Sequence, residues 1–243
     1  FKEYGLPDEL VYLPHVESSF NYNAYSKVGA AGIWQFMRST AKLYKLKVNY
    51  VVDERRDVIK ATKAAAKLLR DNYRILNSWP LALTAYNHGA RSMQRAVKNI
   101  GTKEIHRIID EYGGRRFGFA SKNFYATFMA TVLISRNPEQ YFKEFTMPQP
   151  FRYSVIELKR SYTVSQVAKE LGLTSAIIGK YNPSIRKSAL RSALALPKNF
   201  NLHIPKTSEA ELKKMQTAIH SLKAKEIDYN LDRLHIISRG ENL

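Results

Sequence analysis

Glu17 is the residue of this sequence best placed for acid chemistry, because it falls inside an apolar stripe. The apolar positions around it recur at helical spacing: Leu6, Leu10, Leu13 and Phe20. At ~100° per residue, Glu17 lies within about 40° of the three leucines. Burial raises the pKa of a carboxyl group toward neutrality, and this is the property that a general acid needs. For an isolated glutamate, pairing with Arg or Lys at the edge of the core would be the favoured interpretation.

Two further clusters could complete a site with Glu17. The first is Gly29-Ala-Ala-Gly-Ile-Trp-Gln35-Phe-Met, and the second is Ala85-Tyr-Asn87-His-Gly. Glycine lets the backbone approach a ligand closely. The amides of Gln35 and Asn87 offer the donors and acceptors that suit a ligand with hydroxyl and acetamido groups. Either amide alone would more often be a surface or loop-capping residue, so the indication lies in the combination.

Two aromatic residues of these clusters, Trp34 and Tyr86, have two interpretations. They pack in the hydrophobic core, or they stack on the apolar faces of sugar rings. For Trp34 we favour the core.

The elements that must position these residues are helices. Strand-like alternation is nearly absent from residues 1–147, which predicts an all-α domain. Helices are expected over 39–44, 58–76, from Trp79 onward and over about 123–135, with shaped loops at 20–33 and 112–121. Pro14 removes a helix hydrogen bond and should kink the chain just before Glu17.

The pattern changes at Pro148 and Pro150, which mark a domain boundary. Over residues 151–206 the sequence predicts a small β-α-α-β unit, with strands at 153–158 and 202–204 and helices capped by Thr163 and Thr174. A linker helix is expected within 207–234. Residues 235–243 read as the start of a truncated second copy of the small unit.

Composition narrows the partners. The formal net charge is +18 and the excess is spread along the chain, which favours attraction to a polyanion such as nucleic acid, an acidic membrane surface or an acidic wall polymer. No zinc-finger spacing, RNP-type aromatic motif or phosphate-binding loop accompanies the charge, so nucleic acid is not the expected partner. The absence of cysteine fits an oxidising compartment without requiring one.

The three clusters, in this order, resemble the soluble-lytic-transglycosylase domain, which is related to goose-type lysozyme. The resemblance rests on Glu17-Ser18, Gly32-Ile-Trp-Gln-Phe-Met37 and Ala85-Tyr-Asn-x-Gly89, and extends over about residues 5–137. It is greatest to the membrane-bound type D branch of lytic murein transglycosylases, in which LysM modules follow the catalytic domain. Residues 151–206 look like one LysM module, although Ser161-Tyr162 stands where LysM modules usually have Gly and an acid.

The resemblance implies a lysozyme-like catalytic fold and assigns roles to single residues. Glu17 matches the catalytic acid, and Ser18 is expected to orient it or to contact the glycan. Gln35, Tyr86 and Asn87 match residues that line the cleft. A tyrosine of the last helix also contributes in this family. Phe124 and Tyr125 compete for that position, and Tyr125 is the candidate. No metal or cofactor is implied.

The implied reaction is cleavage of the MurNAc-β-1,4-GlcNAc bond without water, which leaves 1,6-anhydro-MurNAc ends. One carboxyl group suffices, acting first as acid and then as base. Accordingly no second acid stands at a motif position, and Asp53, Glu54 and Asp57 read as loop and helix-start residues. The alternatives are a goose-type-like peptidoglycan hydrolase and a catalytically inactive glycan-binding protein; a nucleic-acid-binding protein is favoured by charge alone.

The expected partner is the glycan strand of peptidoglycan, and the expected location is the periplasm or cell envelope, reached with an export signal that this sequence does not contain. The protein is expected to be a monomer. Attachment to the outer membrane through a segment preceding Phe1 is left open.

Overall fold

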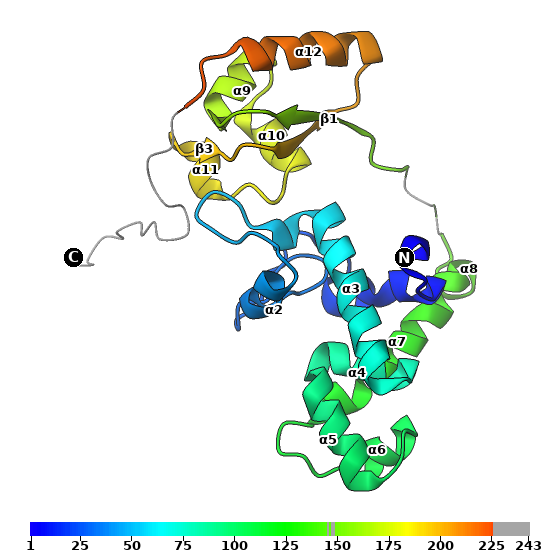
Figure 1. Cartoon of the computed structure of the whole chain (residues 1–243). Helices are drawn as coiled ribbons and strands as arrows, with labels where there is room; N and C mark the ends of the chain where they lie inside the picture. Colours follow the sequence, from blue (N-terminus) through cyan, green and yellow to red (C-terminus); the bar gives the residue numbers. More distant parts are fainter. Residues whose placement is uncertain (145, 147–148, 226–243) are drawn as a thin grey trace, which may run out of the picture. The chain divides into compact units, whose positions relative to one another are not determined.

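The computed structural model describes residues 1–144, 146 and 149–225, and the chain divides into two compact units. Unit 1 comprises Phe1–Lys45 and Val58–Met147, and unit 2 comprises Leu46–Asp57 and Pro148–Leu243. Figure 1 shows the elements of both units. The mainly helical fold class is confirmed.

The division differs from the sequence prediction at residues 46–57. The sequence placed this segment in the first domain, but the structure packs it with unit 2. Val51 and Val52 are fully buried in the hydrophobic core of unit 2, and the backbone N–H of Asp53 donates to the carbonyl oxygen of Ser184 at 2.8 Å. The segment therefore leaves unit 1 and returns to it between two helices.

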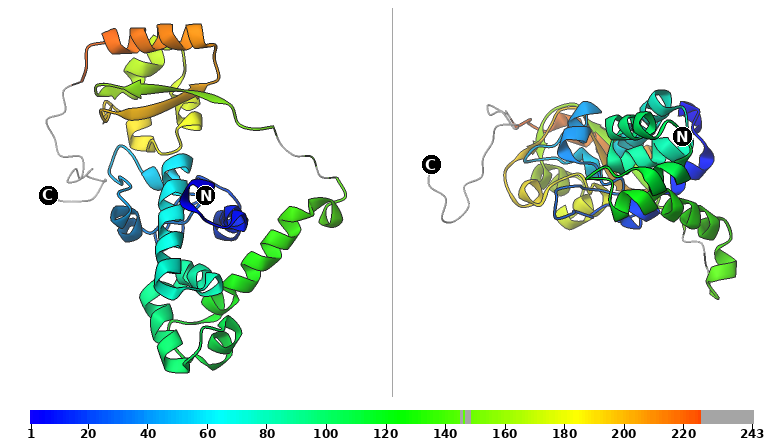
Figure 2. Two further views of the ribbon diagram at one scale, coloured as in Figure 1. Left: turned by 45° about the vertical axis from the view of Figure 1, so that its right-hand side comes forward. Right: turned by 90° about the horizontal axis from the view of Figure 1, so that it is seen from below.

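Unit 1 is built from helices, and no strand longer than an isolated bridge occurs among its described residues. Two short 3₁₀ helices at the start precede α1, and the helices of unit 1 are α1 Leu13–Ser18, α2 Arg38–Leu43, α3 Val58–Leu76, α4 Trp79–His88, α5 Ala90–Ile100, α6 Ile105–Glu111, α7 Phe119–Arg136 and α8 Pro138–Tyr141. In Figures 1 and 2, α5 and α6 lie together at one end of the unit, next to α4.

The segment before Glu17 departs from a single kinked helix. A 3₁₀ helix over Asp8–Tyr12 leads into α1, and Pro14 occupies the first turn of α1, where its missing N–H costs nothing. The three leucines of the stripe are buried as predicted. Phe20 is 43% exposed, contrary to the prediction, because α1 ends at Ser18 and the chain turns through positive φ angles at Ser19 and Phe20.

Helix α3 has the predicted bounds, and alanines form much of its buried face. Ala61, Ala64 and Ala65 are buried, and α4 packs on this helix. Leu69 is fully buried, whereas Leu68 is only half-buried.

The Gly-rich loop is shorter than predicted, because α7 begins at Phe119. Gly118 caps the helix in an extended conformation, and the helix then runs to Arg136, where Asn137-Pro138 ends it as predicted. The core face of α7 is formed by Ser121, Phe124, Phe128 and Val132.

Unit 2 contains the predicted β-α-α-β order. Strand β1, Tyr153–Leu158, pairs antiparallel with β4, Phe200–Pro205. Helices α9, Val164–Glu170, and α10, Ser175–Tyr181, lie between them in sequence. Thr163 begins α9 with a capping box completed by Gln166, and Thr174 caps α10.

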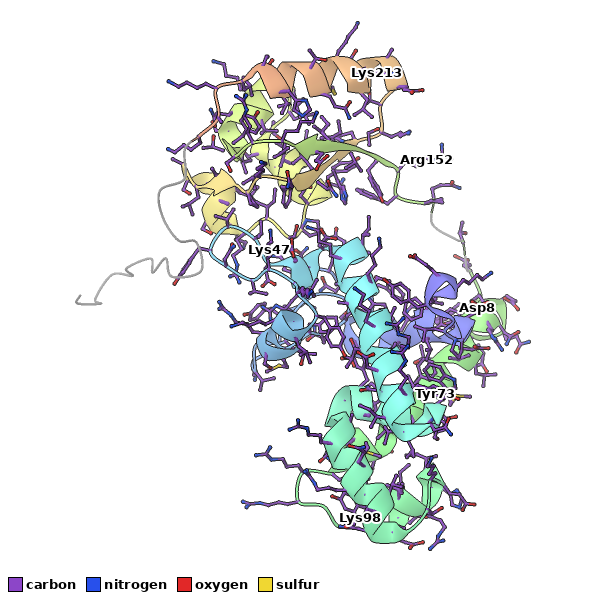
Figure 3. The ribbon with its side chains drawn as sticks, in the orientation of Figure 1. Asp8, Lys47, Tyr73, Lys98, Arg152 and Lys213 are labelled. Atoms are coloured by element: carbon purple, nitrogen blue, oxygen red, sulfur yellow. The ribbon has the colours of Figure 1, made fainter. Side chains whose placement is uncertain are left out.

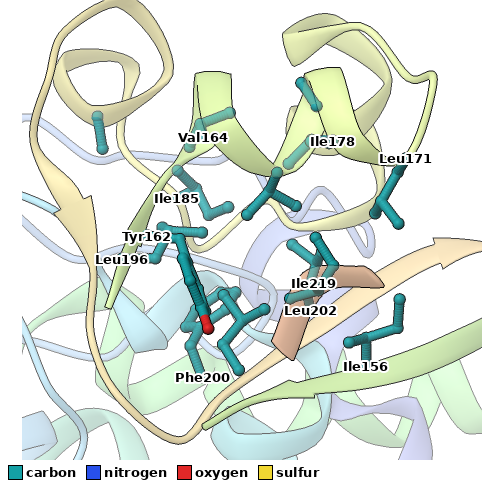
Figure 4. Packing of buried hydrophobic residues seen from close by; sticks show 14 of the residues in the cluster. Ile156, Tyr162, Val164, Leu171, Ile178, Ile185, Leu196, Phe200, Leu202 and Ile219 are labelled. Carbon is teal, nitrogen blue, oxygen red and sulfur yellow. The ribbon is translucent and has the colours of Figure 1, made fainter. Parts of the chain in front are cut away.

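The connection from α10 to β4 holds structure that the sequence did not predict. It contains α11, Lys187–Arg191, and a short strand β3, Ala195–Leu196, which pairs with β2, Tyr162–Thr163. Figure 4 shows the core that these elements enclose, with the Tyr162 ring beside Leu196 and Phe200.

Helix α12, Glu209–Ser221, was expected as a linker. Its Ile219 is fully buried in the core of unit 2, and the helix packs on β1 and α9. The helix is therefore a part of this unit. The remaining residues of the expected linker beyond 225, and the predicted second copy at 235–243, lie outside the described residues. No helix among the described residues is long and apolar enough to cross a membrane.

Candidate active site

Glu17 lies in the last turn of α1, where the chain is about to turn away. It is half-buried, since the leucines that share its stripe draw this face of the helix into the core of unit 1. Among the described residues its carboxyl group makes no hydrogen bond and no ion pair. The alternative interpretation was a glutamate at the edge of the core that pairs with Arg or Lys. Within the described residues Glu17 has no such partner.

Burial raises the pKa of Glu17 to about 7, from an ordinary value of 4.5. The cause is desolvation, which disfavours the charged form of a carboxyl group that no cation stabilises. Near neutral pH the group is thus present in both forms. A carboxyl group in this condition can give up a proton and take one back within a single reaction.

Tyr86 lies within electrostatic reach of Glu17. The pKa of its phenol is raised, mainly by burial and further by the negative charge of Glu17. Its hydroxyl group donates a hydrogen bond of 2.8 Å to the carbonyl oxygen of Trp34. Trp34 itself is buried, stacks on Phe1 and donates from its ring N–H to Thr62, so its interpretation as a core residue is confirmed.

Ser18 connects α1 to the glycine loop. Its hydroxyl group donates to the carbonyl oxygen of Ile33 at 3.0 Å. Together with the bond from Tyr86 to Trp34, this contact joins all three sequence clusters. The two bonds also bring the polar candidates into place. Glu17 precedes Ser18, Gln35 follows Trp34, and Asn87 follows Tyr86 in the sequence.

Gln35 is held in a strained turn. Its φ is 45°, a region that side-chain-bearing residues rarely occupy. Its amide nitrogen donates to the carbonyl oxygen of Gly32 at 2.8 Å, which fixes the turn. The amide oxygen has no hydrogen-bond partner within the described residues, so it remains available to a ligand. Gly32 in turn has a φ of 77°, where glycine carries no steric penalty.

Asn87 is positioned by a residue that the sequence analysis did not single out. The hydroxyl group of Ser121 donates to Oδ1 of Asn87 at 2.9 Å and lies 3.2 Å from Nδ1 of His88. Because the hydroxyl group has one proton, His88 must donate the second bond from its Nδ1. Asn87 is exposed, and its amide nitrogen has no hydrogen-bond partner among the described residues. The sequence analysis had placed Ser121 at the end of the predicted loop 112–121, with no role of its own.

The two candidates of α7 differ in exposure. Phe124 is buried in the core, whereas Tyr125 is half-buried. Tyr125 follows Ser121 by one helical turn, so it lies on the side of α7 that faces the end of α4. Of the two, Tyr125 is the one with surface to offer a ligand.

The other acids considered in the sequence lie in unit 2. The carboxylate of Asp53 accepts from Arg55 and Arg186, and that of Glu54 accepts from the backbone N–H of Lys47. No cluster of three or more His, Asp or Glu side chains suited to a metal ion occurs in the described part of the chain.

Comparison with known proteins finds a family match within the helical region. Residues 2–109 match the family model described as "Transglycosylase SLT domain". Over 191 residues the chain is 29% identical to the "Membrane-bound lytic murein transglycosylase D" of Escherichia coli strain K12, and this covers 78% of the chain and 42% of the relative. The protein of the same name from Escherichia coli O6:H1 has the same identity and coverage.

A third relative is the "Putative tributyltin chloride resistance protein" of Alteromonas sp. strain M-1. It is 38% identical over 100 residues, which cover 41% of the chain and 48% of the relative. The chain thus spans less than half the length of the curated relatives that it matches.

Proposed function

We propose that this chain, which contains a transglycosylase SLT domain at residues 2–109, cleaves the MurNAc-β-1,4-GlcNAc bond of peptidoglycan and leaves 1,6-anhydro-MurNAc ends. The observation that carries the proposal is the carboxyl group of Glu17, half-buried and unpaired within the described residues, with a pKa raised to about 7. The match to the SLT family and the likeness to the type D transglycosylases support the same reaction.

In the first step, protonated Glu17 donates its proton to the bridging oxygen. The bond from this oxygen to C1 of the muramic acid breaks, and the bonding electrons remain on the leaving oxygen. Positive charge develops at C1, where the acetamido oxygen of the same sugar can stabilise it. Glu17 is now a carboxylate.

In the second step, the carboxylate of Glu17 takes the proton of the C6 hydroxyl group, and the C6 oxygen bonds to C1. Glu17 returns to its starting form and no water is consumed. A nucleophile on the same sugar needs no encounter with a second molecule, which favours the internal attack when the ring is held correctly. Gln35, Tyr86, Asn87 and Tyr125 are proposed to hold the sugar, and Ser18 to hold α1 against the glycine loop.

A single acid suffices for this scheme, whereas hydrolysis usually uses two carboxyl groups. Asp53 and Glu54 belong to unit 2 and are already engaged by Arg55, Arg186 and Lys47. This arrangement supports transglycosylation over hydrolysis by a second carboxylate.

Unit 2 is proposed to be a LysM-like glycan-binding module. The proposal is supported by the observed order β1, α9, α10, β4 and by the antiparallel pairing of its outer strands. The proposed substrate places the protein in the periplasm or cell envelope. The positive net charge of +18 favours residence on a wall that carries carboxylates.

Digestion of purified sacculi tests the proposal. Wild type and Glu17→Gln are incubated with the sacculi, and the soluble products are analysed by mass spectrometry. We expect anhydro ends from wild type and a loss of roughly a thousandfold in rate for Glu17→Gln, because the amide cannot donate the proton. Glu3→Gln is the matched control, because it makes the same change at an exposed position of unit 1.

If wild type releases products with reducing ends, the reaction is hydrolysis, and the proposed function becomes that of a peptidoglycan hydrolase. Full activity of Glu17→Gln would remove Glu17 from the mechanism. No product from wild type, with binding to sacculi retained, would favour the inactive glycan-binding protein.

A further inference from the structure

Unit 1 contains a cavity of about 280 Å³ beside the proposed active site. The cavity is formed by the ends of α4 and α6, one side of α5 and the loop between α6 and α7. Its lining residues are His88, Ser92, Arg95, Tyr112, Gly114, Arg115 and Arg116. The volume lies near the lower limit of small-ligand pockets, which begin at roughly 300 Å³.

Three of the lining residues carry positive charge: Arg95, Arg115 and Arg116. None of the three makes an ion pair with a described residue. Among the described residues, Arg95 donates only to the hydroxyl group of Ser92, at 3.0 Å. The acids at the two ends of α6 are engaged elsewhere, since Glu111 pairs with Arg107 and Glu104 lies beside His106. The cavity therefore has three guanidinium groups and no carboxylate of its own.

Two rings that line the cavity, His88 and Tyr112, pack on Phe117, which is not part of the lining. Phe117 is buried and contacts the His88 ring edge-on at 5.0 Å between ring centres. It also packs at 5.6 Å against the ring of Tyr112. A side chain at Gly114 would displace the outer end of the Tyr112 ring. Arg115 and Arg116 follow in the same loop and line the cavity.

The cavity adjoins the proposed sugar site through His88. This residue lines the cavity and also contacts Ser121, the residue that fixes the amide of Asn87. Burial and the positive charge of Arg95 lower the pKa of His88, so at neutral pH it contributes a neutral ring and the charge comes from the arginines.

We propose that this cavity binds the free carboxylates of the peptide that peptidoglycan carries on its muramic acid. Guanidinium groups bind carboxylates with two parallel, charge-assisted hydrogen bonds, and three of them suit a peptide with several acidic groups. A muramic acid held at Glu17 carries such a peptide on its lactyl group. The inference rests on the proposed function, and it adds a preference for strands whose peptides keep free carboxylates.

Binding of two matched ligands tests the inference. One is a soluble disaccharide-peptide from peptidoglycan, and the other is the same compound with its carboxylates converted to amides. Affinities are measured by calorimetry on the full chain carrying Glu17→Gln, so that no ligand is consumed. We expect about tenfold tighter binding of the native ligand, which is the effect of a single good charge-assisted contact.

The arginines are then changed in that background. Arg95→Gln, Arg115→Gln and Arg116→Gln combined should reduce the preference for the native ligand to about one. Lys98→Gln is the control. It removes the same charge from α5 at an exposed position outside the cavity lining (Figure 3) and should keep the preference.

Equal affinity of the starting protein for both ligands would overturn the inference, and so would an unchanged preference in the triple variant. The proposed function fails differently, by the absence of anhydro ends in the digestion of sacculi. The two failures are distinguishable because the binding measurement requires no catalysis.

Discussion

Unit 1 and unit 2 each bury a carboxyl group, and they treat it in opposite ways. Glu17 in unit 1 has neither an ion pair nor a hydrogen bond among the described residues, and burial raises its pKa to about 7. Asp53 in unit 2 is 1% exposed and contacts two guanidinium groups, of Arg55 at 2.7 Å and of Arg186 at 3.1 Å.

The difference matches the roles proposed for the two groups, a proton donor for Glu17 and a structural ion pair for Asp53. An unpaired buried acid costs stability whenever it ionises, and a chain that retains one gains a proton donor near neutral pH. The buried Asp53 is instead held by charge-assisted hydrogen bonds from two guanidinium groups. Asp53 joins residues 46–57 to Arg186 near the start of α11, so it holds the two parts of unit 2 together.

Replacement of Asp53 by Asn should have a large effect on the stability of unit 2. Arg55 is 1% exposed, and removal of the charge opposite a buried guanidinium group costs about 3–5 kcal/mol. Hydrogen exchange at the amides of β1 and β4 measures this loss in unit 2. The fluorescence of the two tryptophans, Trp34 and Trp79, both in unit 1, measures the stability of unit 1 separately.

The control for Asp53→Asn is Glu209→Gln, which breaks an exposed ion pair with Lys213 in the same unit. Exposed pairs contribute about 0–1 kcal/mol, so exchange at β1 and β4 should hardly change. Equal effects of the two substitutions would show that the buried pair is no more important than a surface pair, and the contrast between Asp53 and Glu17 would lose its basis.

The second prediction concerns how the stability of unit 1 depends on pH. The folded-state pKa of Glu17 is raised from 4.5 to about 7, so between these values the folded chain binds more protons than the unfolded chain. The stability of unit 1 should therefore fall as pH rises from 5 to 8, by at most roughly 3 kcal/mol from this group. Urea unfolding followed by tryptophan fluorescence measures the slope, and Glu17→Gln should remove this contribution. A slope that is the same in wild type and in the variant would contradict the raised pKa.

The sequence predicted most of the elements because their signals are local. The helix over 58–76, the caps Thr163 and Thr174 and the strand at 153–158 depend on residues within a few positions of each other. Glu17 was found in the same way, since its stripe lies within one short segment.

The features that the sequence did not predict depend on contacts between distant residues. Residues 46–57 join unit 2 through Arg186 and Ser184, more than 120 positions away, and no local pattern indicates such a partner. The role of Ser121 depends on the end of α4, 34 positions earlier. Phe20 continues the apolar periodicity but follows the end of α1, which periodicity alone cannot locate.

The smallest expected effects on stability come from replacing one tyrosine by phenylalanine in each unit, Tyr86 in unit 1 and Tyr162 in unit 2. The hydroxyl group of Tyr86 donates to the carbonyl oxygen of Trp34 at 2.8 Å. The hydroxyl group of Tyr162 is buried without a hydrogen-bond partner among the described residues. Tyr86→Phe should lower the stability of unit 1 by about 1 kcal/mol, because a buried carbonyl group loses its donor.

Tyr162→Phe should leave the stability of unit 2 unchanged or raise it by up to about 1 kcal/mol, because an unsatisfied buried hydroxyl group is removed and the ring is kept. The ring itself is fully buried against Leu196 and Phe200, so Tyr162→Ala should destabilise the unit by about 3–5 kcal/mol. Hydrogen exchange at β1 and β4 measures both variants. A loss of stability in Tyr162→Phe equal to that in Tyr86→Phe would mean that the hydroxyl group of Tyr162 has a partner, and that unit 2 uses this polar atom as unit 1 uses Tyr86.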